Sequence, residues 1–308
     1  MAPFSDALSG RLQQEIHHRR LPDEFMQAVQ RWYLPLAQAL AERKKQGQTA
    51  LISLNGAQGT GKSTLTAFLR LLLNEHFQQY TVEISIDDFY LTRAERLQLS
   101  QQLHPLLKTR GVPGTHDIAL AEQTLDGLQA CSADHVIDLP QFDKAQDDRK
   151  PRSQWLKINR PVDIILFEGW CNNAPVQSAE QLQQPVNELE RQEDAEGIWR
   201  NYVNEQLKIY HQKLFQRADV LVFLQAPSFE KVYEWRGLQE QKLKEQANAN
   251  QSAVMDEQQL RRFIQHYERI TRSCLEVLPG VADIVLSLGD DHQIESMKRR
   301  DQEEAGRP

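Results

Sequence analysis

The most constraining feature of this 308-residue sequence is a glycine-rich segment at residues 56–64. It reads G-A-Q-G-T-G-K-S-T and fits the P-loop pattern G-x-x-x-x-G-K-[ST]. In such a loop the backbone N–H groups point at a polyphosphate, the lysine reaches the β- and γ-phosphates, and the serine hydroxyl binds Mg²⁺. The candidate nucleotide-binding residues are Gly56, Ala57, Gln58, Gly59, Thr60, Gly61, Lys62, Ser63 and Thr64, and Ser63 is also a candidate metal ligand.

The segments on either side of this loop are those that the motif requires. Residues 50–54 are mostly apolar and predict a strand, whereas residues 63–74 carry leucine and phenylalanine at helical spacing. The positive end of a helix that follows the loop also favours phosphate. The context therefore indicates a nucleotide site, and the pattern alone does not specify a kinase.

Composition favours one α/β domain with helical additions, because 40% hydrophobic residues are enough to bury a substantial core. The net charge is −7 and no segment is strongly basic, so we do not expect a nucleic-acid partner. No run of apolar residues is long enough to cross a membrane, and no export signal is recognised. The three cysteines lack metal-ligand spacing and suit reduced thiols, so a cytoplasmic protein is expected.

Acidic residues follow two predicted strands. Residues 80–86 alternate as a strand and lead into Asp87 and Asp88. The most apolar run of the chain, residues 161–167, ends in Glu168. Ligands collect at the carboxyl ends of parallel strands, so Asp87 and Asp88 are interpreted as a base or as Mg²⁺ ligands rather than a turn or helix cap. Glu168 is a candidate metal ligand for the same reason.

Three further segments carry polar residues whose role the pattern leaves open. The turn-rich segment 110–117 contains Arg110, His116 and Asp117, which suit a ligand loop, although Asp117 could equally cap the helix that follows. The charged loop 141–150 follows a predicted strand at 135–140 and is either solvated surface or a substrate loop. The predicted helix 229–246 carries Arg236, and a cation on such a helix is usually only solvated.

The chain divides into three predicted parts. Residues 1–47 are a helical segment that Pro35 should bend or split, packed on the core. Residues 48–290 form the nucleotide-binding domain, with a long surface insertion at 171–194 and a last strand at 284–288. Residues 291–308 are expected to be a charged, flexible tail.

Several motifs together resemble the P-loop type of D-glycerate 3-kinase, over roughly residues 25–290. This type is similar to the wider group of uridine kinase, phosphoribulokinase and pantothenate kinase. One difference is the sequence C-N-N at residues 171–173, which is more polar than the family pattern and bears on the acceptor pocket. Besides the P-loop, the matching motifs are S-I-D-D-F-Y at 85–90, R-G-V-P-G-T-H-D at 110–117, P-Q-F-D-K at 140–144, F-E-G-W at 167–170 and W-R at 235–236.

The resemblance implies a P-loop NTPase fold, with a mostly parallel sheet flanked by helices, a helical N-terminal addition and a lid. It implies a kinase that transfers the γ-phosphoryl group of ATP, with Mg²⁺, to a hydroxyl of D-glycerate as small-molecule acceptor. A nucleoside or pantothenate kinase and a non-catalytic nucleotide-binding protein remain as alternatives. The implied catalytic residues are Asp87 as base, Lys62 and the lid residue Arg236; the implied acceptor-binding residues are Arg110, His116, Asp117, Asp143 and Lys144; and the metal candidates are Ser63, Glu168 and Asp88.

Overall fold

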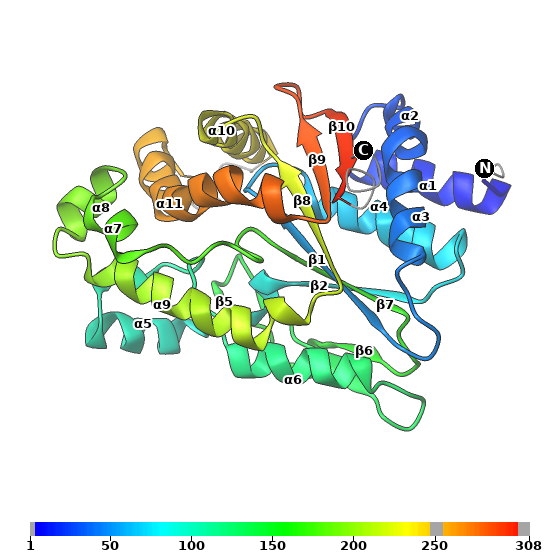
Figure 1. Ribbon diagram of the computed structural model, residues 1–308, viewed down its shortest axis with the longest axis horizontal. Helices are drawn as coiled ribbons and strands as arrows, with labels where there is room; N and C mark the ends of the chain where they lie inside the picture. Colours follow the sequence, from blue (N-terminus) through cyan, green and yellow to red (C-terminus); the bar gives the residue numbers. More distant parts are fainter. Residues whose placement is uncertain (1–3, 247–254, 301–308) are drawn as a thin grey trace, which may run out of the picture.

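The apolar runs of the sequence pair as one six-stranded sheet in the computed structural model, which describes residues 4–246 and 255–300 (Figure 1). All strand pairs are parallel except the last, in which β10 runs antiparallel to β9. Strands β1 and β7 are buried along their whole length, as their near-continuous apolar sequences predict. In spatial order the strands are β10 (Ile294–Arg299), β9 (Ile284–Leu288), β8 (Val220–Gln225), β1 (Ala50–Gly56), β7 (Ile164–Gly169) and β2 (Thr81–Ser85).

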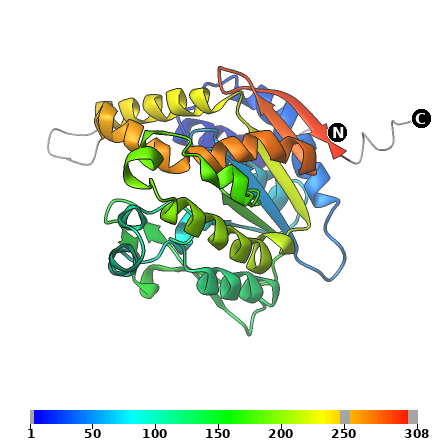
Figure 2. The ribbon, with the colours of Figure 1, turned by 60° about the vertical axis from the view of Figure 1, so that its left-hand side comes forward.

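Helices cover both faces of this sheet (Figure 2). Successive residues of a strand point to opposite faces of the sheet, so Ile52 packs with the helices on one face and Leu51 with the helices on the other. The helices on each face form one layer. The first layer contains α1 (Asp6–His18), α2 (Phe25–Ala28), the π-helical turn η1 (Val29–Tyr33), α3 (Leu34–Ala41) and α4 (Lys62–Glu75). The second contains α6 (Ile118–Gln129), α9 (Ile198–Lys213) and α11 (Glu257–Val281). The predicted fold class is confirmed.

The N-terminal segment is helical, and instead of a split before Pro35 the helical run 25–41 contains a π-helical turn. This turn, η1, ends at Tyr33, so that Pro35 lies in the first turn of α3, where its missing N–H is tolerated. Leu12 of α1 and Leu36 of α3 are fully buried. They belong to the apolar cluster that also contains α4 and one face of the sheet, so this segment packs on the nucleotide-binding core.

The expectation for the last part of the chain is corrected in two respects. Strand β9 does not close the sheet, because β10 forms from residues that the sequence assigned to a flexible tail. Ile294 and Met297 of β10 pack against the apolar cluster of the first layer and are partly buried there. The charged residues around them hide this pattern in the sequence. Residues 301–308 of the predicted tail lie outside the described residues.

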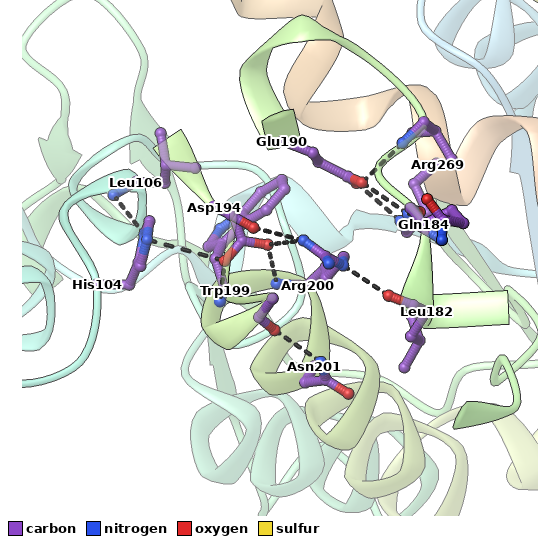
Figure 3. A network of polar contacts seen from close by, with 12 residues as sticks. His104, Leu106, Leu182, Gln184, Glu190, Asp194, Trp199, Arg200, Asn201 and Arg269 are labelled. Carbon is purple, nitrogen blue, oxygen red and sulfur yellow. Dashed lines mark hydrogen bonds and ion pairs between the residues drawn. The ribbon is translucent and has the colours of Figure 1, made fainter. Parts of the chain in front are cut away.

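The segment 171–194 is also more than a surface insertion. It contains α7 (Ala179–Gln183) and α8 (Glu188–Glu193), and Figure 3 shows how ion pairs fasten the end of this region. Glu190 accepts from Arg269 of α11 at 2.6 Å, and Asp194 accepts from Arg200 of α9 at 3.0 Å. All four side chains are buried, and burial requires such pairing. Two acids of this polar segment therefore form buried ion pairs with helices of the core.

Shorter elements surround the carboxyl edge of the sheet. The strand predicted at 135–140 appears as β3, but it pairs with β6 in a separate two-stranded sheet. None of the helices within the described ranges has the length and apolar character needed to span a membrane. The remaining elements are α5 (Arg93–Gln102), α10 (Phe229–Gln246), β3 (Ile137–Leu139), β4 (Phe142–Asp143), β5 (Asp148–Arg149), β6 (Leu156–Ile158), and the 3₁₀ turns η2 (Ile86–Phe89), η3 (Pro105–Lys108), η4 (Arg152–Gln154) and η5 (Phe215–Arg217).

Candidate active site

The P-loop connects β1 to α4 in a conformation that suits phosphate. Gly59 and Gly61 have φ angles of +82° and +87°, which turn the backbone N–H groups inward. Gly61 is the N-cap of α4 and provides no side-chain cap, so the first N–H groups of this helix remain available to an anion. Lys62 curls over the loop and donates to the carbonyl oxygen of Ala57 at 3.1 Å.

A cavity of about 400 Å³ lies beside this loop and gathers residues from distant parts of the chain. It contains the three predicted catalytic residues and two of the five predicted acceptor-binding residues, together with four aromatic side chains. The lining residues are Gln58, Gly59, Lys62, Ser63, Asp87, Tyr90, Arg110, Lys144, Glu168, Gly169, Trp170, Arg236, Phe263 and Tyr267.

Strand register explains why Glu168 lies beside the phosphate loop. In the sheet Glu168 is paired with Leu54 of β1 on one side and with Ser85 of β2 on the other. Burial raises the pKa of Glu168, and the nearby Lys62 ammonium opposes this effect. Carboxylate and hydroxyl oxygens are the ligands that Mg²⁺ prefers, so Ser63 and Glu168 in one cavity fit a magnesium ion that keeps several waters.

Asp88 faces elsewhere. It lines a separate cavity of about 760 Å³ beyond the edge strand β2, and its Oδ1 accepts from the backbone N–H of Phe142 at 3.4 Å. Burial and the adjacent Asp87 carboxylate raise the pKa of Asp88 to about 6. Of the three predicted metal ligands, the structure brings Ser63 and Glu168 together and leaves Asp88 outside the cavity.

Both carboxylate oxygens of Asp87 are hydrogen-bonded within the cavity. Tyr90 donates its hydroxyl to Oδ1 at 2.7 Å, and the Lys144 ammonium donates to Oδ2 at 2.6 Å. Burial alone would raise the pKa of Asp87, but Lys144 and Tyr90 outweigh it, so this pKa lies below its usual range. Asp87 is therefore ionised at neutral pH and able to accept a proton.

His116 lies in a layer behind Tyr90. The two rings are stacked with centroids 4.5 Å apart, and Nδ1 of His116 is 2.9 Å from the hydroxyl oxygen of Tyr210. The His116 side chain is buried and does not line the cavity, and burial lowers its pKa to about 4. A neutral His116 thus supports Tyr90, which in turn holds Asp87.

Asp117 and Asp143 have local structural partners. Asp117 caps α6 by accepting from the N–H of Leu120 at 3.0 Å, and it pairs with Arg149 at 3.2 Å. Asp143 accepts from two backbone N–H groups of its own loop. Neither residue lines the cavity, so for Asp117 the capping alternative describes what the structure contains.

Arg110 and Lys144 are two cations that line the cavity together with the P-loop. The guanidinium of Arg110 pairs with Asp147, and it also contacts the carbonyl oxygen of Lys144 at 3.4 Å. Backbone contacts fix the Arg110 loop, because Tyr267 donates to the carbonyl of Arg110 at 3.1 Å. A side chain at Gly111, whose φ is +139°, would collide with the Tyr267 hydroxyl, which explains the glycine there.

Arg236 projects into the cavity from α10, which packs on the P-loop. It pairs with Glu240 one turn later, and its guanidinium carbon lies 5.7 Å from the centroid of the Phe263 ring. Its Nη1 is buried and has no hydrogen-bond partner among the described residues. The position beside the P-loop agrees with a lid residue.

Sequence reasoning missed the aromatic lining of the cavity. Tyr90 and Trp170 stand inside recognised motifs, so their motif position was the available signal. Phe263 and Tyr267 come from α11, far from the P-loop in sequence, and no local pattern marks them. Trp170 donates to the carbonyl of Gly111 at 3.0 Å and therefore also holds the Arg110 loop.

A second, mainly apolar cavity of about 240 Å³ lies on the other side of the P-loop. Thr60, Gly61 and Thr64 form its P-loop wall, and the N-terminal helical segment forms the opposite wall with Phe25 and Tyr33. The other lining residues are Leu21, Pro22, Leu65, Leu224, Leu288, His292, Gln293 and Ile294. We call this cavity the apolar slot.

Comparisons with known proteins agree with this geometry. The chain is 33% identical over 233 residues to the uncharacterized kinase mug58 of Schizosaccharomyces pombe, covering 73% of this chain and 80% of that protein. It is 28% identical over 226 residues to the chloroplastic D-glycerate 3-kinase of Arabidopsis thaliana, covering 70% of this chain and 46% of that protein. No protein-family model matches the chain.

A solved structure of similar fold is D-glycerate 3-kinase from Cryptococcus neoformans. It superposes with a TM-score of 0.70 at 25% sequence identity, over 86% of this chain and 97% of that chain.

Proposed function

This chain belongs to the family of P-loop kinases that includes D-glycerate 3-kinase, and we propose that its acceptor is D-glycerate. As a member of that family it is an ATP-dependent phosphotransferase that acts on a hydroxyl group. D-glycerate offers a carboxylate and two hydroxyls. A pocket for it needs an anion clamp close to a proton acceptor, in reach of the γ-phosphate.

The observation that carries the proposal is the composition of the 400 Å³ cavity. Its lining includes Lys62 of the P-loop and the cations Arg110 and Lys144, and Lys144 donates to Asp87. Charged donors bind a carboxylate more strongly than neutral donors do. Two cations beside the candidate base favour a small anionic acceptor over a nucleoside.

In the proposed reaction the acceptor hydroxyl oxygen attacks the γ-phosphorus, and Asp87 takes the hydroxyl proton. The bond between the γ-phosphorus and the β,γ-bridging oxygen breaks, so ADP leaves with the electron pair. Backbone N–H groups and Lys62 hold the phosphates, and Arg236 stabilises the charge that moves between the oxygens. Positioning and charge neutralisation supply most of the catalysis in this class of reaction.

Two further assignments complete the ATP site. Ser63 and Glu168 would hold Mg²⁺, which neutralises phosphate charge when it is bound. The apolar slot would receive the nucleotide base, because Thr60, Gly61 and Thr64 connect it directly to the phosphate loop. Flat bases gain much of their binding energy from apolar and aromatic contacts, and Phe25 and Tyr33 supply such surfaces.

ADP release tests the acceptor. We expect D-glycerate to stimulate it far above uridine, cytidine or pantothenate, and Arg110→Ala to raise the KM for the acid while sparing the KM for ATP. Loss of one charged contact should cost about thirty- to a hundredfold in kcat/KM. Arg152→Ala is the matched control, because Arg152 is an exposed cation that pairs with Asp138 away from the cavity.

The same screen separates the alternatives. If a nucleoside or pantothenate is the better acceptor, the kinase class stands and the D-glycerate proposal fails. If ATP binds but no acceptor stimulates ADP release, and Asp87→Asn changes nothing, the non-catalytic alternative is supported.

A further inference from the structure

Asp87 has two partners that differ in mobility. Tyr90 is buried, with its ring between His116 at 4.5 Å and Phe142 at 5.2 Å. Lys144 lies in the loop between β4 and β5, and its side chain is 62% exposed. The tyrosine is thus fixed in place, whereas the lysine can swing away from Asp87 without unpacking the core.

The lysine contact reduces the ability of Asp87 to act as a base. Oδ2 accepts from the ammonium at 2.6 Å and Oδ1 accepts from the tyrosine hydroxyl at 2.7 Å, so each oxygen already has one donor and has less capacity left for an acceptor hydroxyl. The positive charge of Lys144 also lowers the pKa of Asp87 against the effect of burial. An uncapped Asp87 would be both more accessible and more basic.

A carboxylate on the acceptor would compete for Lys144. Arg110 contacts the Lys144 backbone oxygen, so an anion bound by Arg110 lies within the range of the flexible lysine side chain. The two acids next to Lys144 have other partners: Asp147 of the same loop pairs with Arg110 and Arg96, and Asp143 of β4 accepts from two backbone N–H groups. Moving Lys144 from one carboxylate to another exchanges equivalent ion pairs, so the exchange requires little free energy.

We propose that Lys144 is an acceptor-operated cap on Asp87: the ammonium covers Oδ2 until the carboxylate of an acidic acceptor draws it away. The proposal rests on the proposed function and deepens it, because it assigns to one residue both anion binding and control of the base. Water and neutral polyols have no carboxylate and leave the cap closed. The device thus disfavours ATP hydrolysis when no acceptor is bound.

The test uses the full chain and Lys144→Met, which keeps the hydrocarbon stem and removes the charge. ATP hydrolysis without acceptor should rise on the order of tenfold, a part of the 10²–10⁴ that a positioned base contributes. The kcat/KM for glycerol should rise similarly, whereas that for D-glycerate should fall. Glycerol is chosen because it replaces the carboxylate of glycerate with an uncharged hydroxymethyl group.

Three variants serve as controls. Lys150→Met removes the same charge from the same region, but Lys150 donates to Gln141 and does not touch Asp87, so wild-type rates are expected. Lys144→Arg should keep hydrolysis low, because it retains a cationic cap. In the double variant Asp87→Asn, Lys144→Met the gain in hydrolysis should disappear, since it operates through Asp87.

Two results would refute the cap, and a third would refute only the proposed acceptor. If Lys144→Met impairs D-glycerate but leaves ATP hydrolysis and glycerol unchanged, Lys144 is only an anion clamp and the cap is refuted. If all three rates fall, Lys144 orients Asp87 productively and the cap is again refuted. If wild-type protein ignores D-glycerate but the hydrolysis gain occurs, the proposed acceptor fails while the cap survives.

Discussion

Trp235 rests directly on Gly59: a Cβ added to this glycine would lie 3.2 Å from the Cβ of Trp235. The helix α10, which carries the candidate lid residue Arg236, therefore packs directly on the phosphate loop. This contact brings the Arg236 guanidinium to the cavity beside the P-loop, and its Nη1 has no hydrogen-bond partner among the described residues.

Arg236→Ala should lower kcat more than it weakens ATP binding, because a lid cation is most useful when charge moves between oxygens. Steady-state kinetics and ATP titration measure the two effects. Lys231→Ala on the same helix is the control, since Lys231 pairs with Glu234 and Asp290 outside the cavity. Wild-type kinetics for Arg236→Ala would leave Arg236 as an ordinary helix cation.

Lys62→Ala should leave a folded protein that uses ATP poorly. Its ammonium contacts the P-loop carbonyl of Ala57 and faces the phosphate cavity, and it makes no contribution to either apolar layer. Calorimetry of ATP binding and a melting curve separate the two effects. Unchanged ATP turnover would contradict the nucleotide site itself.

The fold was largely predictable because its signals are local. The strand before Gly56, the apolar run to Glu168 and the spacing of α4 each follow from a few neighbouring residues. The strand β10 and the insertion were not predictable in this way. Their burial depends on partners distant in sequence, such as Arg269 for Glu190, and a polar composition alone does not reveal that pairing.

The site was predictable in its residues more than in its arrangement. The motifs predict Asp87, Arg110 and Lys144 as site residues, and the structure places all three in one cavity. The motif at residues 110–117, which contains Arg110, also contains His116 and Asp117. In the structure His116 stacks on Tyr90 and Asp117 caps α6. Residues adjacent in a loop point in different directions, and sequence position does not tell which of them faces the ligand.

Asp88 gives the protein a specific pH dependence of stability. Its pKa is about 6 in the folded state and about 3.8 ordinarily, so folding favours the protonated form. Stability from this group is complete below pH 4 and is lost as the pH rises through 6. Asp88→Asn stays neutral, and should therefore raise the free energy of unfolding by about 3 kcal/mol at pH 7.5 and by less than about 1 kcal/mol near pH 4.

Denaturant unfolding of wild type and Asp88→Asn at the two pH values, without added metal, provides the measurement. Asp138→Asn is a control carboxylate, because Asp138 pairs with the exposed Arg152. Equal stability of the two proteins at pH 7.5 would show that Asp88 is ionised in the fold without penalty.

Asp87→Asn should retain binding of ATP but lose turnover by about a hundredfold or more, the usual scale for a positioned base. The amide keeps the shape of the side chain and the contact with Tyr90, yet it cannot take the hydroxyl proton. Asp88→Asn serves as the comparison in the kinetic assay. A larger turnover loss in Asp88→Asn, with ATP binding intact, would transfer the role of base to Asp88.

The apolar slot, if it holds the base, gives the N-terminal helical segment a part in ATP binding. Phe25→Ala removes an aromatic wall, and loss of one stacking contact costs about 1–3 kcal/mol, so the Kd for ATP should rise roughly five- to a hundredfold. Binding of inorganic tripolyphosphate should not change, because it has phosphates and no base. Met26→Ala is the matched control, since Met26 is a partly buried neighbour that packs on the core and does not line the slot. If Phe25→Ala weakens ATP and tripolyphosphate equally, the substitution has disturbed the phosphate loop, and the base binds elsewhere.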